Sequence, residues 1–276
     1  MDIKEYRDLQ AANVDINNKF SMLQMVEINP TELCNRKCSF CPRSDKKVYP
    51  NKNNHITVKT VQRLCEGLKN IQFNNRIGFV GFGEPLLCKT LIPCIKKVKE
   101  LIPDINWLEI NTNGDKLTTR KIKQLYEAGL THITISMYDS DKTNFFREMR
   151  GKIPIELIFR HHYNPDLGYN LDIVNRKEIL EKENKIYSKD SCFLPFYKLM
   201  LDWNGDILLC NNDWSRQNKF GNVNKDLIEN IWFGKELNTF RRNLLLSRKT
   251  CGPCKYCSIN GKLRGLESVE LFLNYS

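Results

Sequence analysis

The first 160 residues alternate between short apolar runs and longer segments in which apolar residues recur every three to four positions. The short apolar runs predict strands at 22–29, 76–82, 106–111, 131–138 and 153–160. The helical spacing predicts helices at 57–69, 87–101, 118–129 and 142–149. This alternation predicts βαβ units, and hence an α/β fold with a parallel sheet. About five to six strands are too few for a closed eight-stranded barrel, so we expect an open, partial (β/α) barrel.

Local signals refine two of these helices. Thr118 or Thr119 can cap the third predicted helix, and Gly129 can end it. Pro93 lies inside the second predicted helix, where it either kinks the helix or occupies its first turn. In parallel α/β sheets, ligands bind at the carboxyl ends of the strands. We therefore expect the functional residues in the loops that follow the strands.

The pattern changes after residue 160. A weakly patterned segment is followed by two strand-like runs joined by Asn204-Gly205, which is a strong hairpin signal, and then by a helical stretch at 226–247. We expect an N-terminal extension, a core, a linker that covers the active site and a small second domain, with the boundaries 1–21, 22–160, 161–190 and 191–276.

Composition narrows the class of protein. No apolar run approaches the roughly 20 residues of a membrane helix, and the charged N-terminus has no signal-peptide pattern. We therefore expect a cytoplasmic protein. The net charge of +11 is spread along the chain, which favours a solvated lysine-rich surface over an anionic partner. Eight of the 11 cysteines fall into two groups, and in a reducing compartment such groups indicate metal binding or catalysis.

The first cysteine cluster is Cys34-x3-Cys38-x2-Cys41, directly after the first predicted strand. The same spacing would suit cysteines packed along one helix face, but the residues between them are polar and Pro42 follows. A metal site is the better interpretation. Zinc prefers four ligands, and no fourth ligand lies nearby. An iron–sulfur cube held by three cysteines would leave one iron open for a substrate or cofactor.

This loop resembles the signature of the radical S-adenosylmethionine (SAM) enzymes, including the aromatic Phe40 before the last cysteine. The resemblance implies a SAM-binding [4Fe–4S] cluster at Cys34, Cys38 and Cys41. In that superfamily the open iron binds the amino and carboxylate groups of SAM. Reductive cleavage of SAM then yields a 5′-deoxyadenosyl radical, which abstracts hydrogen from the substrate.

The ends of the other strands agree with this resemblance. Gly81-Phe82-Gly83-Glu84-Pro85 resembles the superfamily's Gly-Gly-Glu-Pro motif, which meets the SAM ammonium, although Phe82 interrupts the glycine pair. A plain β–α turn would also explain its glycines and proline. By the same resemblance, further SAM contacts are expected at the ends of the third to fifth strands, at Asn111, Asn113, Ser136 and Arg160. Arginine suits a carboxylate because its planar fork can bind both oxygens.

A second group of cysteines lies in the C-terminal segment, at Cys192, Cys210, Cys251, Cys254 and Cys257. Zinc is an alternative, but a zinc site more often uses two closely spaced pairs. The arrangement around a hairpin and helix resembles the SPASM extension of radical SAM enzymes, or its shortened twitch form. That resemblance implies one auxiliary [4Fe–4S] cluster, best held by Cys192, Cys210, Cys254 and Cys257, with Cys251 as a replacement ligand or a free thiol.

Two residues are candidates for proton transfer. His161 follows the fifth predicted strand, and Asp213 follows Cys210. A histidine here is more often structural than catalytic, and Asp213 could equally cap a turn.

The compact core with one auxiliary cluster most resembles the radical SAM alcohol dehydrogenases of aminoglycoside biosynthesis. This resemblance implies oxidation of a small carbohydrate- or cyclitol-like substrate, with the auxiliary cluster as electron acceptor and reduced flavodoxin or ferredoxin as donor. Two alternatives stay open. The first is a radical SAM enzyme that modifies peptides, although no peptide-binding domain is recognisable before the barrel. The second is a zinc-dependent nucleic-acid-binding protein, although basic and aromatic residues are not paired on one element.

Overall fold

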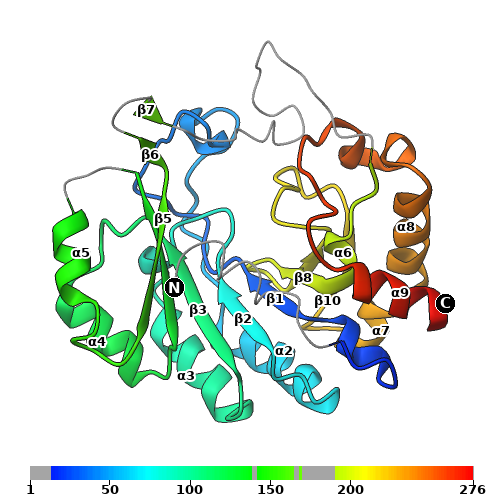
Figure 1. Ribbon diagram of the computed structural model, residues 1–276, viewed down its shortest axis with the longest axis horizontal. Helices are drawn as coiled ribbons and strands as arrows, with labels where there is room; N and C mark the ends of the chain where they lie inside the picture. The colour runs from blue at the N-terminus through cyan, green and yellow to red at the C-terminus, as the bar shows by residue number, and fades with distance from the viewer. Residues whose placement is uncertain (1–13, 139–141, 165–167, 170–189, 276) are drawn as a thin grey trace.

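The computed structural model describes residues 14–138, 142–164, 168–169 and 190–275. Its centre is an eight-stranded sheet in the order β10-β9-β8-β1-β2-β3-β4-β5 (Figure 1). From β8 to β5 every pair of neighbours is parallel, whereas β9 and β10 are antiparallel. The expected α/β fold with an open, mostly parallel sheet is confirmed.

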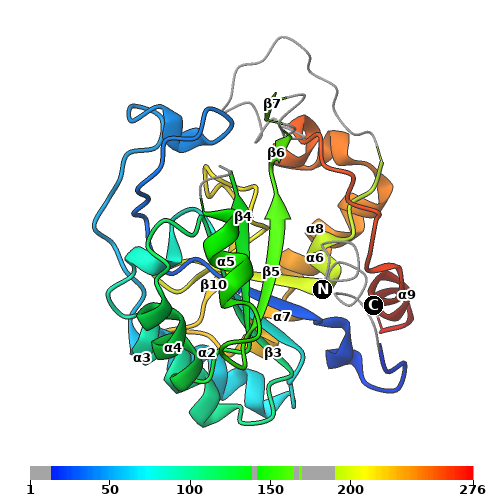
Figure 2. The ribbon, with the colours of Figure 1, turned by 60° about the vertical axis from the view of Figure 1, so that its left-hand side comes forward.

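All five strands expected in the core are present. They are β1 (Met25–Ile28), β2 (Arg76–Phe79), β3 (Trp107–Thr112), β4 (His132–Met137) and β5 (Glu156–His161). The helices between them are α2 (Val58–Asn70), α3 (Leu91–Leu101), α4 (Thr119–Glu127) and α5 (Thr143–Met149). These helices lie along one outer face of the sheet (Figures 1 and 2). Apolar residues of α2 to α4, such as Leu64, Ile95 and Leu125, are fully buried, which accounts for the helical spacing in the sequence.

Capping residues set the helix ends as expected. The Thr118 hydroxyl accepts a hydrogen bond from the Lys121 N–H, and Gly129 follows α4 with a φ of +100°, which a glycine adopts without strain. Pro93 lies in the first turn of α3, so it does not kink the helix. The predicted helix 87–101 begins four residues late, at Leu91, because Pro85–Leu87 forms a separate 3-10 turn.

The C-terminal segment extends the core sheet. It comprises α6 (Leu194–Tyr197), β8 (Lys198–Leu201), β9 (Asp206–Leu208), β10 (Lys219–Asn222), α7 (Ile228–Trp232), α8 (Lys235–Leu246) and α9 (Leu266–Tyr275). The predicted hairpin is present, with Gly205 at a φ of +94° between β8 and β9. Its first strand also pairs in parallel with β1, which the sequence pattern did not indicate. The single helix expected at 226–247 is two helices, separated by Gly234.

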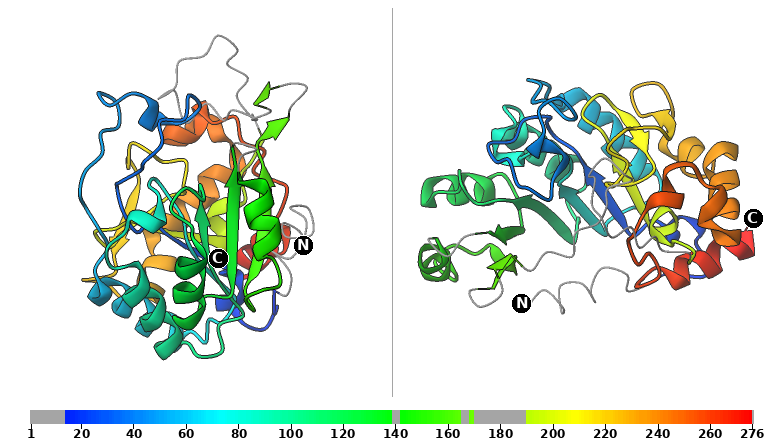
Figure 3. Two further views of the ribbon diagram at one scale, coloured as in Figure 1. Left: turned by 90° about the vertical axis from the view of Figure 1, so that its left-hand side faces the viewer. Right: turned by 90° about the horizontal axis from the view of Figure 1, so that it is seen from above.

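The two ends of the sheet carry different helices. Helices α4 and α5 lie on one side of the molecule, and α8 and α9 lie on the opposite side (Figures 1 and 3). The predicted linker begins with two short strands, β6 (Tyr163–Asn164) and β7 (Gly168–Tyr169), and its remaining part, up to residue 189, falls outside the described residues. Within the described parts of the chain, no helix has the length and apolar character needed to cross a membrane.

Candidate active site

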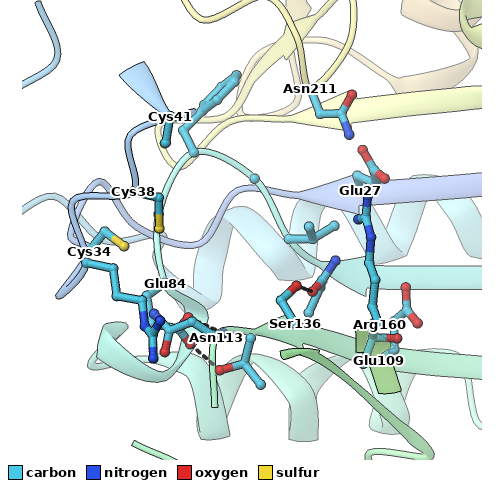
Figure 4. Close-up of a pocket in the computed structure, with 18 of the residues that line it drawn as sticks. Glu27, Cys34, Cys38, Cys41, Glu84, Glu109, Asn113, Ser136, Arg160 and Asn211 are labelled. Atoms are coloured by element: carbon cyan, nitrogen blue, oxygen red, sulfur yellow. Dashed lines mark hydrogen bonds between the residues drawn. The ribbon is translucent and has the colours of Figure 1, made fainter. Parts of the chain in front are cut away.

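A cavity of about 350 Å³ lies at the carboxyl ends of the parallel strands. Most of the residues expected to bind the cofactors line it, and these are Cys34, Cys38, Phe40, Cys41, Gly81, Gly83, Glu84, Asn111, Asn113, Ser136 and Arg160. Figure 4 shows that they come from the loop after β1 and from the ends of β2 to β5. Sequence positions up to 126 residues apart, from Cys34 to Arg160, thus meet at one site.

The three N-terminal cysteines lie on the loop between β1 and α2, hereafter the N-terminal cysteine loop (residues 29–57). All three cysteines line one wall of the cavity. Burial, together with the neighbouring Cys41 and Cys34, raises the pKa of Cys38 to about 11. A shared cationic group would reverse this effect and hold the thiols as thiolates. The donor set therefore fits an iron–sulfur cluster.

Two glycines let the loop after β2 approach the N-terminal cysteine loop. A Cβ atom on Gly83 would lie 2.2 Å from the Thr31 carbonyl oxygen and 2.7 Å from that of Leu33. The Glu84 N–H donates a hydrogen bond to the same Leu33 oxygen at 2.7 Å. Only glycine fits at position 83, because the two backbones are in direct contact. Phe82 between the glycines is buried and contacts Trp214 in the C-terminal segment, with 4.9 Å between the rings.

Glu84 joins the ends of β2 and β3. Its carboxylate accepts hydrogen bonds from the Thr112 hydroxyl at 2.6 Å and from the Asn113 N–H at 2.9 Å. Burial nevertheless raises the pKa of Glu84 above its usual value. Pro85 begins the short turn that follows and does not itself line the cavity.

The ends of β4 and β5 contribute polar side chains from adjacent strands. Ser136 and Arg160 are register partners, and both line the cavity. The Ser136 hydroxyl donates to the Asn111 side-chain oxygen at 3.4 Å (Figure 4). Three neighbouring strands therefore present polar groups at the same level of the site.

The sequence analysis missed an arginine that clamps the N-terminal cysteine loop. Arg36 binds Asp115 with two hydrogen bonds, of 2.6 and 2.7 Å, and this pairing lowers the pKa of Asp115. The Arg36 guanidinium also lies over the ring of Tyr138, which contacts Phe40 with 5.6 Å between ring centroids. These contacts fix the loop against the ends of β3 and β4.

Charged residues on the strands themselves line the floor of the cavity, and these were also missed. Lys198 on β8 donates to Glu27 Oε1 on β1 at 2.8 Å. Arg76 on β2 pairs with Glu109 Oε1 on β3. Glu27 could have been noticed in the sequence as a lone carboxylate between Val26 and Ile28 in an otherwise apolar run. Since alternate residues of a strand face opposite sides of the sheet, such a residue indicates a polar environment on one side.

The C-terminal cysteines are all buried, and these are Cys192, Cys210, Cys251, Cys254 and Cys257. Burial raises the pKa of Cys192 to about 12, with smaller contributions from the neighbouring Cys210 and Cys257. A Cβ atom on Gly261 would lie 2.3 Å from the Cys192 sulfur, so the chain after Cys257 packs tightly against this thiol. Buried neighbouring thiols fit a second cluster for the same electrostatic reason as the first set.

Cys251 packs in the same buried cluster as Cys192, Cys210 and Cys254. Its thiol donates to the Ser247 carbonyl oxygen at 3.5 Å. Burial also raises its pKa, with an opposing contribution from Thr250.

The two candidates for proton transfer do not line the cavity. The fully buried Asp213 carboxylate accepts N–H hydrogen bonds from Gln217 at 3.3 Å and from Asn218 at 3.1 Å, so it caps a turn of its own loop. His161 is exposed at the end of β5, whereas the adjacent His162 stacks on Tyr138. The geometry therefore supports the structural alternative for Asp213 and brings neither residue to the site.

Comparison with known families defines the class of protein. Residues 28–163 match the Radical SAM superfamily, and residues 192–258 match SPASM, an iron–sulfur cluster-binding domain. This chain belongs to the radical SAM superfamily and carries a SPASM domain, and it is a radical SAM oxidoreductase that uses SAM and two [4Fe–4S] clusters. The second match favours iron over the zinc alternative for the C-terminal cysteines.

Two relatives of known activity match this chain over different lengths. The chain is 27% identical to the SAM-dependent 2-deoxy-scyllo-inosamine dehydrogenase of Niallia circulans over 241 residues, which are 86% of this chain and 93% of that protein. It is 31% identical to the GTP 3′,8-cyclase of Clostridium acetobutylicum over 127 residues, which are 46% of this chain and 38% of the cyclase. The first likeness covers most of both proteins, whereas the second covers less than half of either.

A solved structure supports the same relationship. The crystal structure of BtrN in complex with AdoMet and 2-DOIA superposes with a TM-score of 0.74 at 27% identity, covering 86% of this chain and 94% of that one. The structure of anSMEcpe with bound AdoMet gives a TM-score of 0.55 at 14% identity and shares the fold alone.

Proposed function

We propose that this enzyme oxidises a secondary alcohol of a small polar, cyclitol-like substrate, with the auxiliary cluster as electron acceptor. The observation that carries the proposal is the shared cavity. Asn211, next to Cys210, lines the same small cavity as Cys38 of the N-terminal cysteine loop. A substrate between these loops would lie near both cofactors. The likeness to the 2-deoxy-scyllo-inosamine dehydrogenase, which covers 93% of that protein, supports the same reaction class.

Each of the two iron–sulfur clusters would be bound by one set of cysteines. Cys34, Cys38 and Cys41 would hold the SAM-binding cluster, because their thiols line one wall of the cavity. Cys192, Cys210, Cys254 and Cys257 would hold the auxiliary cluster, whereas the Cys251 thiol is hydrogen-bonded to Ser247. When bound, the first cluster and SAM supply a carbon radical that removes a hydrogen atom, and the auxiliary cluster supplies an electron acceptor.

The remaining residues of the site would orient SAM. We assign Phe40, Gly81, Gly83, Glu84 and Pro85 to the side of the cavity next to the N-terminal cysteine loop, where they bind or shape the SAM amino group's site. We assign the sugar and carboxylate contacts to Asn111, Asn113, Ser136 and Arg160. Support comes from the position of all but Pro85 on the cavity wall. The arginine fork suits the carboxylate, since it binds both oxygens.

The domain plan, location and electron donor are part of the same proposal. We infer an N-terminal extension, core, linker and auxiliary-cluster domain at 1–21, 22–160, 161–190 and 191–276. The cytoplasm is the compartment that keeps so many thiols reduced. Reduced flavodoxin or ferredoxin would serve as the donor, because low-potential iron–sulfur clusters need a one-electron carrier of low potential.

An anaerobic assay tests the proposal. The reconstituted enzyme, SAM and dithionite are incubated with 2-deoxy-scyllo-inosamine, with related cyclitols lacking the amine, and with short peptides. We expect 5′-deoxyadenosine and a ketone product in a ratio near one with a cyclitol, and transfer of deuterium from the carbinol carbon into 5′-deoxyadenosine. Coupled product from a peptide and none from any cyclitol would instead establish the peptide-modifying alternative.

A further inference from the structure

Two buried carboxylates on adjacent regions of the sheet line the floor of the cavity, and they differ in how their oxygens are satisfied. Glu109 Oε1 accepts from Arg76, and Glu109 Oε2 accepts from the Trp107 indole N–H at 3.0 Å. Both oxygens of Glu109 therefore have donors from the strands around them. The burial of the Glu109 carboxylate is therefore accounted for by hydrogen bonds within the sheet and needs no ligand.

Glu27 has one satisfied oxygen and one open oxygen. Oε1 accepts from the Lys198 ammonium at 2.8 Å, whereas no described residue donates a hydrogen bond to Oε2. The residue is only 6% exposed and lines the cavity. A buried carboxylate oxygen without a donor loses its hydration with nothing in return, and the loss is larger when the group is charged, so such an atom in a native fold calls for a ligand.

Glu27 lies in the part of the cavity where the proposed substrate would bind. In the view of Figure 4, the Glu27 carboxylate and the Asn211 side chain lie together on the side away from Cys34, and both residues line the cavity. Asn211 follows Cys210, so the space between these two side chains adjoins the proposed auxiliary cluster. A group held there lies between the two cysteine sets.

We propose that Glu27 Oε2 accepts a hydrogen bond from a hydroxyl group of the substrate and thereby selects a polyhydroxylated ring. This inference rests on the proposed function and deepens it by naming a specificity-determining residue. Lys198 is a positioning residue, because its ion pair holds the other oxygen and directs the carboxylate into the cavity.

A hydroxyl fits this position better than an ammonium group. The charge of Glu27 is already balanced by Lys198 at 2.8 Å. Among the described residues that line the cavity, five are cationic and three are carboxylates. An additional cation would therefore meet more positive than negative charge, whereas a neutral O–H donor supplies the missing hydrogen bond without that repulsion.

The test is a binding cycle that needs no turnover. The holoenzyme with SAM, left unreduced, is titrated calorimetrically with 2-deoxy-scyllo-inosamine and with analogues that each lack one hydroxyl or the amine. In the wild-type enzyme, removal of one particular hydroxyl should weaken binding about 10- to 100-fold, as expected for a hydrogen bond to a charged group. In Glu27→Gln the same removal should cost less than about 3-fold, because the partner is already lost.

Two further variants keep the result interpretable. Glu27→Asp retains the charge beside Lys198 but withdraws the oxygen, so it should weaken binding of the parent compound and lessen the discrimination. Glu156→Gln changes a strand carboxylate outside the cavity and should bind like the wild type. Iron content and substrate-independent formation of 5′-deoxyadenosine with dithionite report whether each variant is folded and loaded.

Each outcome of the titrations supports or overturns the role of Glu27. If Glu27→Gln discriminates among the analogues as the wild type does, the inference is overturned while the proposed function stands. If the lost coupling belongs to the amine, Glu27 binds a cation and the hydroxyl assignment is wrong. If the wild type binds no cyclitol at all, the proposed function fails and this inference fails with it.

Discussion

Arg216 ties the loop after Cys210 to the N-terminal cysteine loop, and its removal is the most informative test of how the two are connected. Its guanidinium donates to Glu32 Oε1 at 2.9 Å, to the Asp202 carboxylate and to the Tyr49 hydroxyl. The arginine side chain is 18% exposed and the Asp202 side chain is 0% exposed. Arg216→Ala would therefore leave two carboxylates largely buried without their cationic partner.

The magnitude follows from this burial. Removing one partner of a buried ion pair costs about 3–5 kcal/mol. Asp202 keeps its hydrogen bonds from the Asn29 side chain at 2.7 Å and from the Trp203 N–H at 2.9 Å, which moderates the loss. We expect the free energy of unfolding to fall by about 3 kcal/mol, near the lower end of that range. Arg216→Lys should lie between the wild type and the alanine variant, because a single ammonium cannot bind three partners in a fork.

Urea unfolding of the anaerobic holoenzyme, followed by circular dichroism, measures this change. With a slope of about 2–3 kcal/mol per molar urea, the midpoint should shift by about 1 M or more. Arg120→Ala, at an exposed arginine, should change stability by less than about 0.5 kcal/mol. A loss below about 1 kcal/mol in Arg216→Ala would refute the reasoning, since the network would then behave like exposed surface pairs.

Three other changes test separate parts of the structure. Cys38→Ala should lower bound iron by about half, measured per chain, and abolish 5′-deoxyadenosine formation, because one of the two clusters loses a ligand; unchanged iron would contradict the assignment. Gly83→Ala places a Cβ 2.2 Å from the Thr31 carbonyl oxygen and should reduce iron incorporation and stability. If the variant instead has the iron content and stability of the wild type, the two loops can separate without loss. Burial lowers the pKa of His132 to about 4, so the unfolded chain takes up a proton that the folded chain does not, and stability should fall as the pH drops from about 6.5 toward 4. After allowance for partial exposure this amounts to about 1 kcal/mol at pH 5, and it should disappear in His132→Gln but persist in His161→Gln when urea midpoints at pH 7 and 5 are compared.

The core strands and helices could be predicted because burial imposes a period on the sequence. Leu64 and Leu68, for example, recur at helical spacing and pack against the sheet. The parallel pairing of β8 with β1 could not be predicted in this way. The run KLML is mostly apolar whether its neighbour is a hairpin partner or a strand 173 residues earlier, and only tertiary contacts distinguish the two.

The residues of the candidate site likewise divide into those that the sequence could predict and those that it could not. Residues that follow strands, such as Glu84 and Arg160, could be placed because the carboxyl ends of parallel strands meet at one edge. Glu27 and Glu109 were missed, because a charged residue inside an apolar run indicates a polar partner but does not distinguish a cavity from a salt bridge. Asp213 was a plausible base from its position, but its oxygens are used by the N–H groups of its own turn.

The pairing of β1 with β8 has a consequence for how the two parts of the chain can exist. Without the C-terminal segment, β1 would become an uncovered sheet margin, with all four of its residues buried in the intact fold. Such a margin offers unpaired N–H and C=O groups to other chains and promotes aggregation. The core is therefore expected to aggregate when expressed by itself, because the segment that carries the second set of cysteines also completes the sheet of the first.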